Sequence, residues 1–176
     1  YVTLYAFSTE NWKRSKEEVD ALMELLCEFI DANLSVMIEK GLRLMVTGRM
    51  WGLPEKSQEY LRLAIEKTAS NRRGTLILAL NYGGRAEIVD TAKKIVQDVM
   101  NGKLSIENIN EKTFAERMYL PEVPDPDLLI RTSGELRLSN FLLWELSYSE
   151  IYVTDTLWPD FDMEELRKAV SAYGRR

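Results

Sequence analysis

The stretch Thr75-Leu76-Ile77-Leu78-Ala79-Leu80 decides the fold of this chain. An apolar run of this kind, without alternating charges, is typical of a strand buried on both faces, as strands of a parallel sheet are. Pro54 opens a predicted helix that runs to about residue 69, and residues 71–74 turn the chain into the strand. A second predicted helix, at 85–100, follows the strand. This part of the sequence therefore indicates a helix, a buried strand and a helix in succession.

The same alternation extends in both directions along the chain. The longest predicted helix, at 17–40, carries apolar side chains at steps of three and four residues and ends at Gly41. Further elements are expected as strands at 2–7, 42–47, 128–130 and 150–154 and as helices at 111–118, 140–148 and 162–173. This succession predicts an α/β fold with a central, mostly parallel β-sheet and helices on both faces. Ligands in such sheets bind at the carboxyl ends of the strands, so the loops that follow strands are the candidate sites.

Length and composition favour a single domain over residues 1–176. The 176 residues, of which 45% are hydrophobic, are enough for one sizeable core. The proline-rich segment 121–126 is too short to separate domains. The chain starts at Tyr1, inside a strand pattern and without a methionine, so we expect the domain to be N-terminally truncated.

Charge, hydropathy and cysteine content exclude several classes of protein. The formal net charge is -5 with both signs interspersed, so no basic stripe could follow a nucleic-acid backbone. No apolar run has the ~18 residues of a membrane span, and no segment resembles a signal peptide. The single cysteine, Cys27, lies among apolar residues and favours a reduced, structural thiol. We therefore expect a cytoplasmic protein with at most peripheral membrane contact.

The chain contains no histidine, which restricts its chemistry. Imidazole catalysis and histidine-ligated metals are excluded, and one cysteine cannot build a thiolate zinc site. A metal in this protein would be a hard cation held by carboxylates and substrate oxygens, most simply Mg²⁺.

The loop after the first strand is the first candidate site. Ser8-Thr9-Glu10-Asn11-Trp12-Lys13-Arg14 combines hydroxyls, an acid, an amide, an indole and two cations. Such a density of polar groups at the carboxyl end of a strand indicates a site for an anionic ligand. The alternative is a solvated turn in which Ser8 and Asn11 bond to the local backbone and Trp12 covers the core. The pattern is consistent with both interpretations.

The loop after the predicted strand 128–130 is the second candidate site. Arg131-Thr132-Ser133-Gly134-Glu135-Leu136-Arg137-Leu138-Ser139 carries two arginines, two serines and a glycine. Guanidinium groups bind phosphate oxygens in a fork, while Ser and Gly let hydroxyls and backbone N–H groups approach an anion. This composition favours binding of a diphosphate. The alternative is a surface turn whose arginines pair with Glu135 or Glu145.

Two further features rank below these loops. Glu150, at the start of the predicted strand 150–154, could pair with the arginines or share a magnesium ion with phosphates, and a salt bridge is the simpler role. Asn81-Tyr82-Gly83-Gly84-Arg85 could cradle a phosphate at the start of the next helix. It lacks a G-x-G-x-x-G or Walker pattern, so we interpret it as structural.

Together these motifs resemble the cis-prenyltransferase family in its undecaprenyl diphosphate synthase branch. Four stretches in the family's order carry the resemblance, at 4–14, 129–135, 137–144 and 150–161, and the likeness spans essentially the whole chain. It implies the undecaprenyl diphosphate synthase-like α/β fold, a homodimer and Mg²⁺ as cofactor. The implied reaction adds isopentenyl diphosphate units in cis to an allylic diphosphate, farnesyl diphosphate, and makes a long polyprenyl diphosphate such as the undecaprenyl carrier lipid of cell walls.

The resemblance also implies roles for individual residues. Asn11 matches the residue proposed to help remove a proton during condensation, and Glu150 matches a magnesium ligand. The neighbours that match the family's substrate loop are Ser8, Thr9, Glu10, Trp12 and Arg14. The positions that match its isopentenyl diphosphate site are Arg131, Arg137, Leu138 and Ser139. Helices 17–40 and 54–69 would line a tunnel for the growing chain.

Two departures from the family pattern bear on activity. The family's Asp-Gly-Asn motif, with its catalytic aspartate, would lie upstream of Tyr1, so we expect the 176 residues alone to be inactive or nearly so. Leu136 stands where the family motif Gly-Glu-His-Arg has its histidine. The alternative function is a non-catalytic binding or scaffold subunit, although such a subunit would not need the retained polar residues. A nucleotide-binding protein is disfavoured by the missing glycine-rich phosphate motif.

Overall fold

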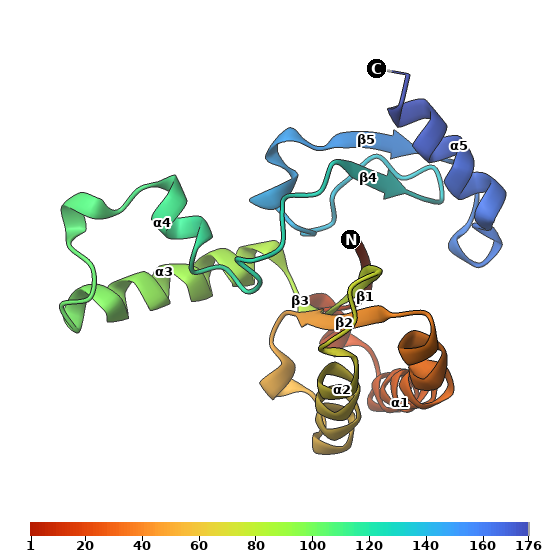
Figure 1. Ribbon diagram of the computed structural model, residues 1–176, viewed down its shortest axis with the longest axis horizontal. Helices are drawn as coiled ribbons and strands as arrows, with labels where there is room; N and C mark the ends of the chain where they lie inside the picture. Colours follow the sequence, from red (N-terminus) through yellow and green to blue (C-terminus); the bar gives the residue numbers. More distant parts are fainter. Residues whose placement is uncertain (176) are drawn as a thin grey trace. The chain divides into compact units, whose positions relative to one another are not determined.

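The computed structural model describes residues 1–175, and its contacts divide the chain into two compact units, Tyr1–Glu122 and Val123–Arg176. Figure 1 shows the chain coloured along the sequence. Each unit combines helices with strands that pair in parallel, which confirms the predicted α/β class. The strands belong to two sheets, one in each unit. The single domain expected over 1–176 stays a prediction.

The first unit is built on a three-stranded parallel sheet with the order β1-β3-β2. Its strands are β1 (Val2–Ser8), β2 (Leu42–Thr47) and β3 (Gly74–Tyr82), and its helices are α1 (Lys16–Glu39), α2 (Glu55–Thr68), α3 (Gly84–Met100) and α4 (Glu111–Ala115). Short 3-10 turns lie at Thr9–Lys13, Met50–Gly52 and Ile106–Asn108. The stretch at 75–80 is the middle strand, and residues 77–82 are all buried. Burial on both faces explains why this strand has no polar alternation.

The core of the first unit lies between the sheet and the helix pair α1 and α2. Figure 1 shows both helices on the same face of the three strands. The buried residues of this cluster are Phe7, Val19, Met23, Ile30, Met37, Leu44, Leu53, Leu61, Ala64, Leu78 and Leu80. Full burial of one large apolar side chain stabilises a fold by ~1.5–3 kcal/mol. The apolar stripe predicted on helix 17–40 is therefore a packing face.

Polar contacts fix both ends of α1. Ser15 Oγ accepts the N–H of Glu18 at 3.2 Å, and Glu18 Oε2 accepts the N–H of Ser15 at 3.2 Å. This reciprocal pair satisfies two backbone donors at the start of the helix. At the other end, Asn71 Nδ2 donates to the carbonyl oxygens of Met37 and Leu42, at 3.2 and 2.8 Å. Asn71 therefore ties the end of α1 to the start of β2.

The second unit contains the parallel strands β4 (Leu128–Arg131) and β5 (Glu150–Val153) and the helix α5 (Met163–Tyr173). The helix predicted at 140–148 is wrong for its first half, because only Glu145–Tyr148 is helical, as a 3-10 turn. Asn140 and Leu142 have φ angles of 63° and 42°. These values lie in the left-handed region, which a right-handed helix excludes.

Other predicted boundaries agree more closely with the structure. The helix expected at 111–118 ends earlier, at Ala115. Asp162 Oδ1 caps α5 by accepting the N–H groups of Glu164 and Glu165 at 2.9 and 3.0 Å. Over residues 1–175 we find no helix with the length and apolar character needed to cross a bilayer.

Candidate functional site

The arginine-rich loop begins at the carboxyl end of β4 in the second unit. Arg131 is the last residue of this strand. The N–H groups of Ser133 and Gly134 donate to the carbonyl oxygens of Thr156 and Thr154, each at 2.9 Å. These bonds fold the start of the loop over the end of β5. The loop thus lies at the carboxyl end of a parallel strand pair, where α/β folds bind their ligands.

Gly134 lets this loop pass close to Asp155. Its φ of +65° lies in the left-handed region, and a Cβ at this position would stand 2.9 Å from Asp155 Oδ1. Ser133 is also left-handed, with a φ of 67°. Left-handed backbone costs a non-glycine residue ~1–2 kcal/mol. The bonds to Thr154 and Thr156, just after β5, help to hold the loop in this shape.

The guanidinium of Arg131 is the clearest candidate for anion binding in the second unit. Its Nη2 donates to Ser139 Oγ at 3.5 Å, which is a long hydrogen bond. Its Nε is buried and has no hydrogen-bond partner among the described residues. A buried donor without an acceptor costs ~1–3 kcal/mol, and a bound anion would remove this cost. The structure therefore brings together Arg131 and Ser139, two residues predicted to bind the diphosphate.

Arg137, unlike Arg131, forms an ion pair within the loop. Its Nη1 lies 2.5 Å from Glu135 Oε2, and its side chain is 66% exposed. This ion pair is the alternative that we considered for the arginines of this loop. Exposed ion pairs contribute only ~0–1 kcal/mol, so a diphosphate could displace Glu135. Leu138 is partly buried, and its carbonyl oxygen accepts the N–H of Phe141 at 3.1 Å.

Glu150 lies at the opposite end of the strand pair from Arg131. It opens β5 opposite Leu128, whereas Arg131 pairs with Val153 at the other end of the strands. The N–H of Glu150 donates to the carbonyl oxygen of Asp127 at 3.0 Å. Because β5 runs parallel to β4, its first residue has to stand beside the first residue of β4. The register therefore sets Glu150 three residues from Arg131 along the strands, and the shared role expected of them stays a prediction.

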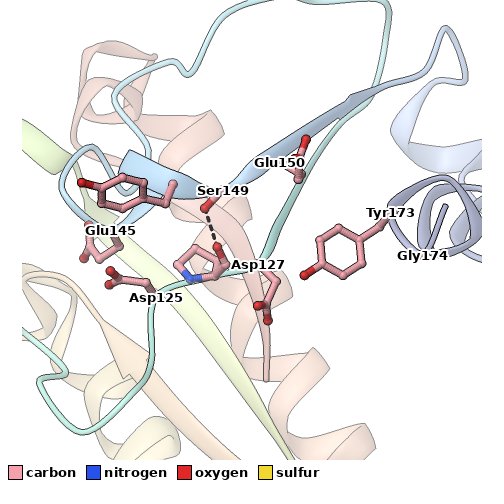
Figure 2. Close-up of a pocket in the computed structure, with 9 residues that line it drawn as sticks. Asp125, Asp127, Glu145, Ser149, Glu150, Tyr173 and Gly174 are labelled. Carbon is pink, nitrogen blue, oxygen red and sulfur yellow. Dashed lines mark hydrogen bonds between the residues drawn. The ribbon is translucent and has the colours of Figure 1, made fainter. Parts of the chain in front are cut away.

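Glu150 instead borders an acidic pocket of about 550 Å³ in the second unit. Figure 2 shows this pocket, and its carboxylates are Asp125, Asp127, Glu145 and Glu150. The hydroxyl of Ser149 donates to the carbonyl oxygen of Pro126 beside them. Within residues 1–175, we find no group of three or more Asp, Glu, Cys or His residues placed to hold a metal ion. A cation here would need oxygen ligands from a substrate.

The other predicted loop, at 8–14, closes β1 in the first unit as the 3-10 turn Thr9–Lys13. Asn11 Oδ1 accepts the N–H of Ser8 at 2.7 Å, so the Asn11 side chain shapes its own loop. Thr9 Oγ1 donates to Glu10 Oε2 at 3.1 Å. Arg14 is exposed, and its N–H donates to the carbonyl oxygen of Asn11 at 3.0 Å. The local bonding expected of a turn is present, and it organises the polar groups predicted to meet a substrate.

Trp12 anchors this loop to the sheet. Its Nε1 donates to Asn81 Oδ1 at 2.7 Å. Its ring meets Phe7 edge to face, with the ring centroids 5.1 Å apart. The indole is 40% exposed, so it is held at the rim of the sheet and not inside the core.

Comparison with known proteins decides the family. A family model described as "Putative undecaprenyl diphosphate synthase" matches residues 1–176. The chain belongs to this family of prenyltransferases. An isoprenyl transferase of Clostridium perfringens is 50% identical over 176 residues, which cover 100% of this chain and 70% of the relative. A Micrococcus luteus protein is 46% identical over 176 residues, covering 100% and 71%, and is named ditrans,polycis-undecaprenyl-diphosphate synthase ((2E,6E)-farnesyl-diphosphate specific).

Solved structures of prenyltransferases have the same fold. Lavandulyl diphosphate synthase from Lavandula x intermedia, in complex with dimethylallyl diphosphate, superposes with a TM-score of 0.96 at 37% identity, over 99% of this chain and 75% of that chain. A probable undecaprenyl diphosphate synthase from Campylobacter jejuni gives a TM-score of 0.87 at 38% identity, over 99% and 79%. The resemblance inferred from the motifs is confirmed, and the chain is a cis-prenyltransferase.

The sequence analysis missed a polar network in the first unit of this prenyltransferase. Arg49 donates to Asp90 in a fork, through Nε at 2.7 Å and Nη2 at 2.8 Å. The hydroxyl of Tyr119 donates to Asp90 Oδ2 at 2.6 Å. Buried Glu87 accepts the hydroxyl of Tyr82 at 2.5 Å and the N–H of Tyr119 at 2.9 Å. Glu87 and Asp90 are three residues apart on α3, a spacing that places them on one face and could have indicated a shared role.

The hydrogen bonds of this network move the pKa values of Asp90 and Tyr119. The Arg49 hydrogen bonds, followed by the smaller effect of the Tyr119 hydroxyl, hold the pKa of Asp90 below its ordinary value of 3.8, although burial opposes the shift. Burial and then the hydrogen bond to Asp90 raise the pKa of Tyr119. Asp90 is therefore charged and Tyr119 neutral at physiological pH, which keeps the network bonded.

Proposed function

We propose that this cis-prenyltransferase condenses isopentenyl diphosphate units in cis onto an allylic diphosphate, farnesyl diphosphate, and releases a long polyprenyl diphosphate such as undecaprenyl diphosphate. The observation that carries the proposal is the match of the family model along the whole chain, joined to 46% identity with the Micrococcus luteus synthase. The buried, unsatisfied Nε of Arg131 supports it from the chemistry of the chain itself.

The arginine-rich loop is proposed to hold isopentenyl diphosphate. Arg131 would complete its hydrogen bonds on the diphosphate, next to the hydroxyl of Ser139. Arg137 would leave Glu135 for a phosphate oxygen, because the exposed ion pair is weak. The bend at Ser139, where φ is 52°, and the neighbouring Leu138 would set the distance between these groups.

The loop at 8–14 is proposed to serve the reacting carbons. In the reaction, the carbon–oxygen bond of the allylic diphosphate breaks and its electron pair leaves with the diphosphate. The terminal alkene carbon of isopentenyl diphosphate bonds to the allylic carbon, and a proton then leaves the adjacent carbon. Asn11 would help to remove this proton, while Ser8, Thr9, Glu10, Trp12 and Arg14 would shape the substrate loop around it. Fixed cations stabilise the charge that develops on the departing diphosphate.

Magnesium is proposed as the cofactor, because a hard cation suits phosphate and carboxylate oxygens. Glu150 is its proposed carboxylate ligand. Within one chain Glu150 stands at the opposite end of the strand pair from Arg131, about 10 Å away along the strands, a span that the two side chains, a diphosphate and an ion could bridge. We derive no step through the ion. A homodimer and a cytoplasmic location are also part of the proposal, the latter supported by the buried free thiol of Cys27.

The test is incorporation of labelled isopentenyl diphosphate by the intact gene product with farnesyl diphosphate and Mg²⁺. We expect organic-extractable products longer than the primer, and no such product from an Arg131→Ala variant. Binding of both diphosphates without elongation would favour the non-catalytic subunit, for which the comparisons offer no support. Absence of both binding and elongation would contradict the proposal altogether.

A further inference from the structure

We propose that Asn81 is a positioning residue that holds the substrate loop at 8–14 through Trp12. Asn81 lies near the carboxyl end of β3, the middle strand of the first unit, and is 7% exposed. The sequence analysis interpreted its motif as structural. The inference deepens the proposed function, because it rests on the assignment of the loop around Asn11 to the reacting substrates.

Both ends of the Asn81 carboxamide are used. Its Oδ1 accepts the indole N–H of Trp12 at 2.7 Å, and its Nδ2 donates to the carbonyl oxygen of Arg49 at 3.0 Å. The backbone carbonyl of Asn81 also accepts the N–H of Arg49, at 3.3 Å. One side chain therefore joins the loop after β1 to the loop after β2 across the strand that separates them. Buried polar groups with every bond made are rigid, since moving them leaves a donor or acceptor unpaired.

The backbone favours asparagine at this position. The φ of Asn81 is 47°, in the left-handed region that asparagine adopts more readily than most other residues. Gly52 packs against the Asn81 side chain, and an added Cβ at this glycine would stand 2.7 Å from Asn81 Nδ2. The carboxamide thus occupies space that a side chain at Gly52 would fill.

The hydrogen bond between Asn81 and Trp12 acts directly beside Asn11. Trp12 follows Asn11 directly, and Asn11 Oδ1 in turn accepts the N–H of Ser8. A bond that fixes the Trp12 indole therefore limits the freedom of the 3-10 turn Thr9–Lys13 that carries Asn11. On the other side, Arg49 is locked by its two hydrogen bonds to Asp90 of α3. Asn81 consequently connects the substrate loop to the loop after β2, which Arg49 ties to α3.

The test uses Asn81→Gly, Asn81→Asp and Trp12→Phe in the intact gene product. Glycine tolerates the left-handed backbone, so N81G removes the side chain without adding strain. Aspartate keeps an acceptor for Trp12 but loses the donor to Arg49, which makes N81D the conservative variant. The matched control is Asn71→Ala, which removes the same number of side-chain hydrogen bonds, two, both donated to carbonyl oxygens at the amino end of the sheet.

The first readout is the indole N–H resonance of Trp12, identified as the resonance that is missing from W12F. We expect it to shift in N81G, to shift less in N81D, and to stay unchanged in N71A. The second readout is kcat/KM at a temperature where all variants are folded. We expect a fall of about tenfold in N81G and in W12F, with N81D between N81G and the wild type. The double variant N81G/W12F should have a kcat/KM no lower than that of the poorer single variant, since both changes break the same hydrogen bond.

An unmoved Trp12 resonance in N81G would overturn the inference, as would a kcat/KM that falls no further in N81G than in N71A. Additive losses in the double variant would show that Asn81 does not act through Trp12 and would also overturn it. A wild-type protein that fails to elongate isopentenyl diphosphate would refute the proposed function. The indole resonance would still decide whether Asn81 holds the loop.

Discussion

Arg131 and Glu150 lie at opposite ends of the same pair of parallel strands. Arg131 closes β4 opposite Val153, and Glu150 opens β5 opposite Leu128. A strand rises ~3.3 Å per residue, so the two positions are about 10 Å apart along the strands. The proposed diphosphate contact at Arg131 and the proposed metal ligand Glu150 therefore come from different ends of the strand pair. Variants at the two positions should have different kinetic signatures.

Glu150→Gln should change the requirement for metal. Loss of the carboxylate charge should raise the Mg²⁺ concentration for half-maximal activity about tenfold or more. The KM for isopentenyl diphosphate at saturating Mg²⁺ should stay near the wild-type value, because Glu150 stands away from Arg131. Rates measured across a Mg²⁺ titration check this prediction. An altered KM with an unaltered Mg²⁺ requirement would place Glu150 in the diphosphate site instead.

Arg137→Ala and Glu135→Gln separate the two interpretations of the exposed ion pair. If Arg137 leaves Glu135 to bind substrate, R137A should raise the KM for isopentenyl diphosphate about tenfold. A tenfold change corresponds to a loss of ~1.4 kcal/mol of binding free energy. E135Q should lower that KM by a few-fold, because Arg137 no longer has to leave a partner. Steady-state kinetics check both changes. Equal and small effects on KM in the two variants would restrict Arg137 to a structural pair.

Gly134→Ala tests the close approach of the loop to Asp155. Gly102→Ala is the matched control, since Gly102 has a φ of +68° with nothing within 4 Å of its added Cβ. The control should lose ~1 kcal/mol of unfolding free energy from backbone strain alone. G134A should lose more, because its Cβ would meet Asp155 Oδ1 at 2.9 Å. Urea unfolding measures the loss of unfolding free energy in both variants. In an Asp155→Ala background the loss caused by G134A should shrink to that caused by G102A. Equal losses in G134A and G102A while Asp155 is still present would contradict the close approach of residue 134 to Asp155.

Asp90→Asn should flatten the acid dependence of stability. The folded pKa of Asp90 lies below its ordinary value of 3.8, chiefly through the Arg49 hydrogen bonds. The charged form therefore stabilises the fold above that ordinary value, and this contribution is lost as the pH falls through the folded pKa. Unfolding free energy below pH ~4 should fall more steeply in the wild type than in D90N. Asp20→Asn, in the exposed pair with Lys16, should keep the wild-type slope. Equal slopes in wild type and D90N would contradict the shift.

Periodicity was sufficient for the regular elements and insufficient for the site. The run at 75–80 and the stripe on 17–40 predicted β3 and α1 because burial imposes a repeat that the residues have to follow. The segment 140–144 has no such repeat, and nothing in its local pattern predicted the left-handed backbone of Asn140 and Leu142. The fork between Arg49 and Asp90 joins residues 41 apart in sequence. Such pairs follow from tertiary structure and not from local spacing.

The position of Glu150 illustrates the same limit in the candidate site. The sequence predicted a strand at 128–130, which the structure extends by one residue to Arg131, and it predicted correctly that Glu150 begins a strand. Glu150 was expected to pair with the arginines or to share a magnesium ion with phosphates, and neither role fixes where Arg131 and Glu150 lie along the strands. Only the parallel register of β4 and β5 shows that they stand at opposite ends.

The most direct test of the account is calorimetric titration of isopentenyl diphosphate into the intact gene product and its Arg131→Lys variant. Lysine keeps the charge but lacks the Nε donor that Arg131 buries without a partner. We predict saturable binding to the wild type and affinity at least about tenfold weaker in R131K, while Arg72→Lys on the surface of the first unit leaves affinity unchanged. Equal affinities of R131K and the wild type would contradict the claim that Arg131 holds the diphosphate.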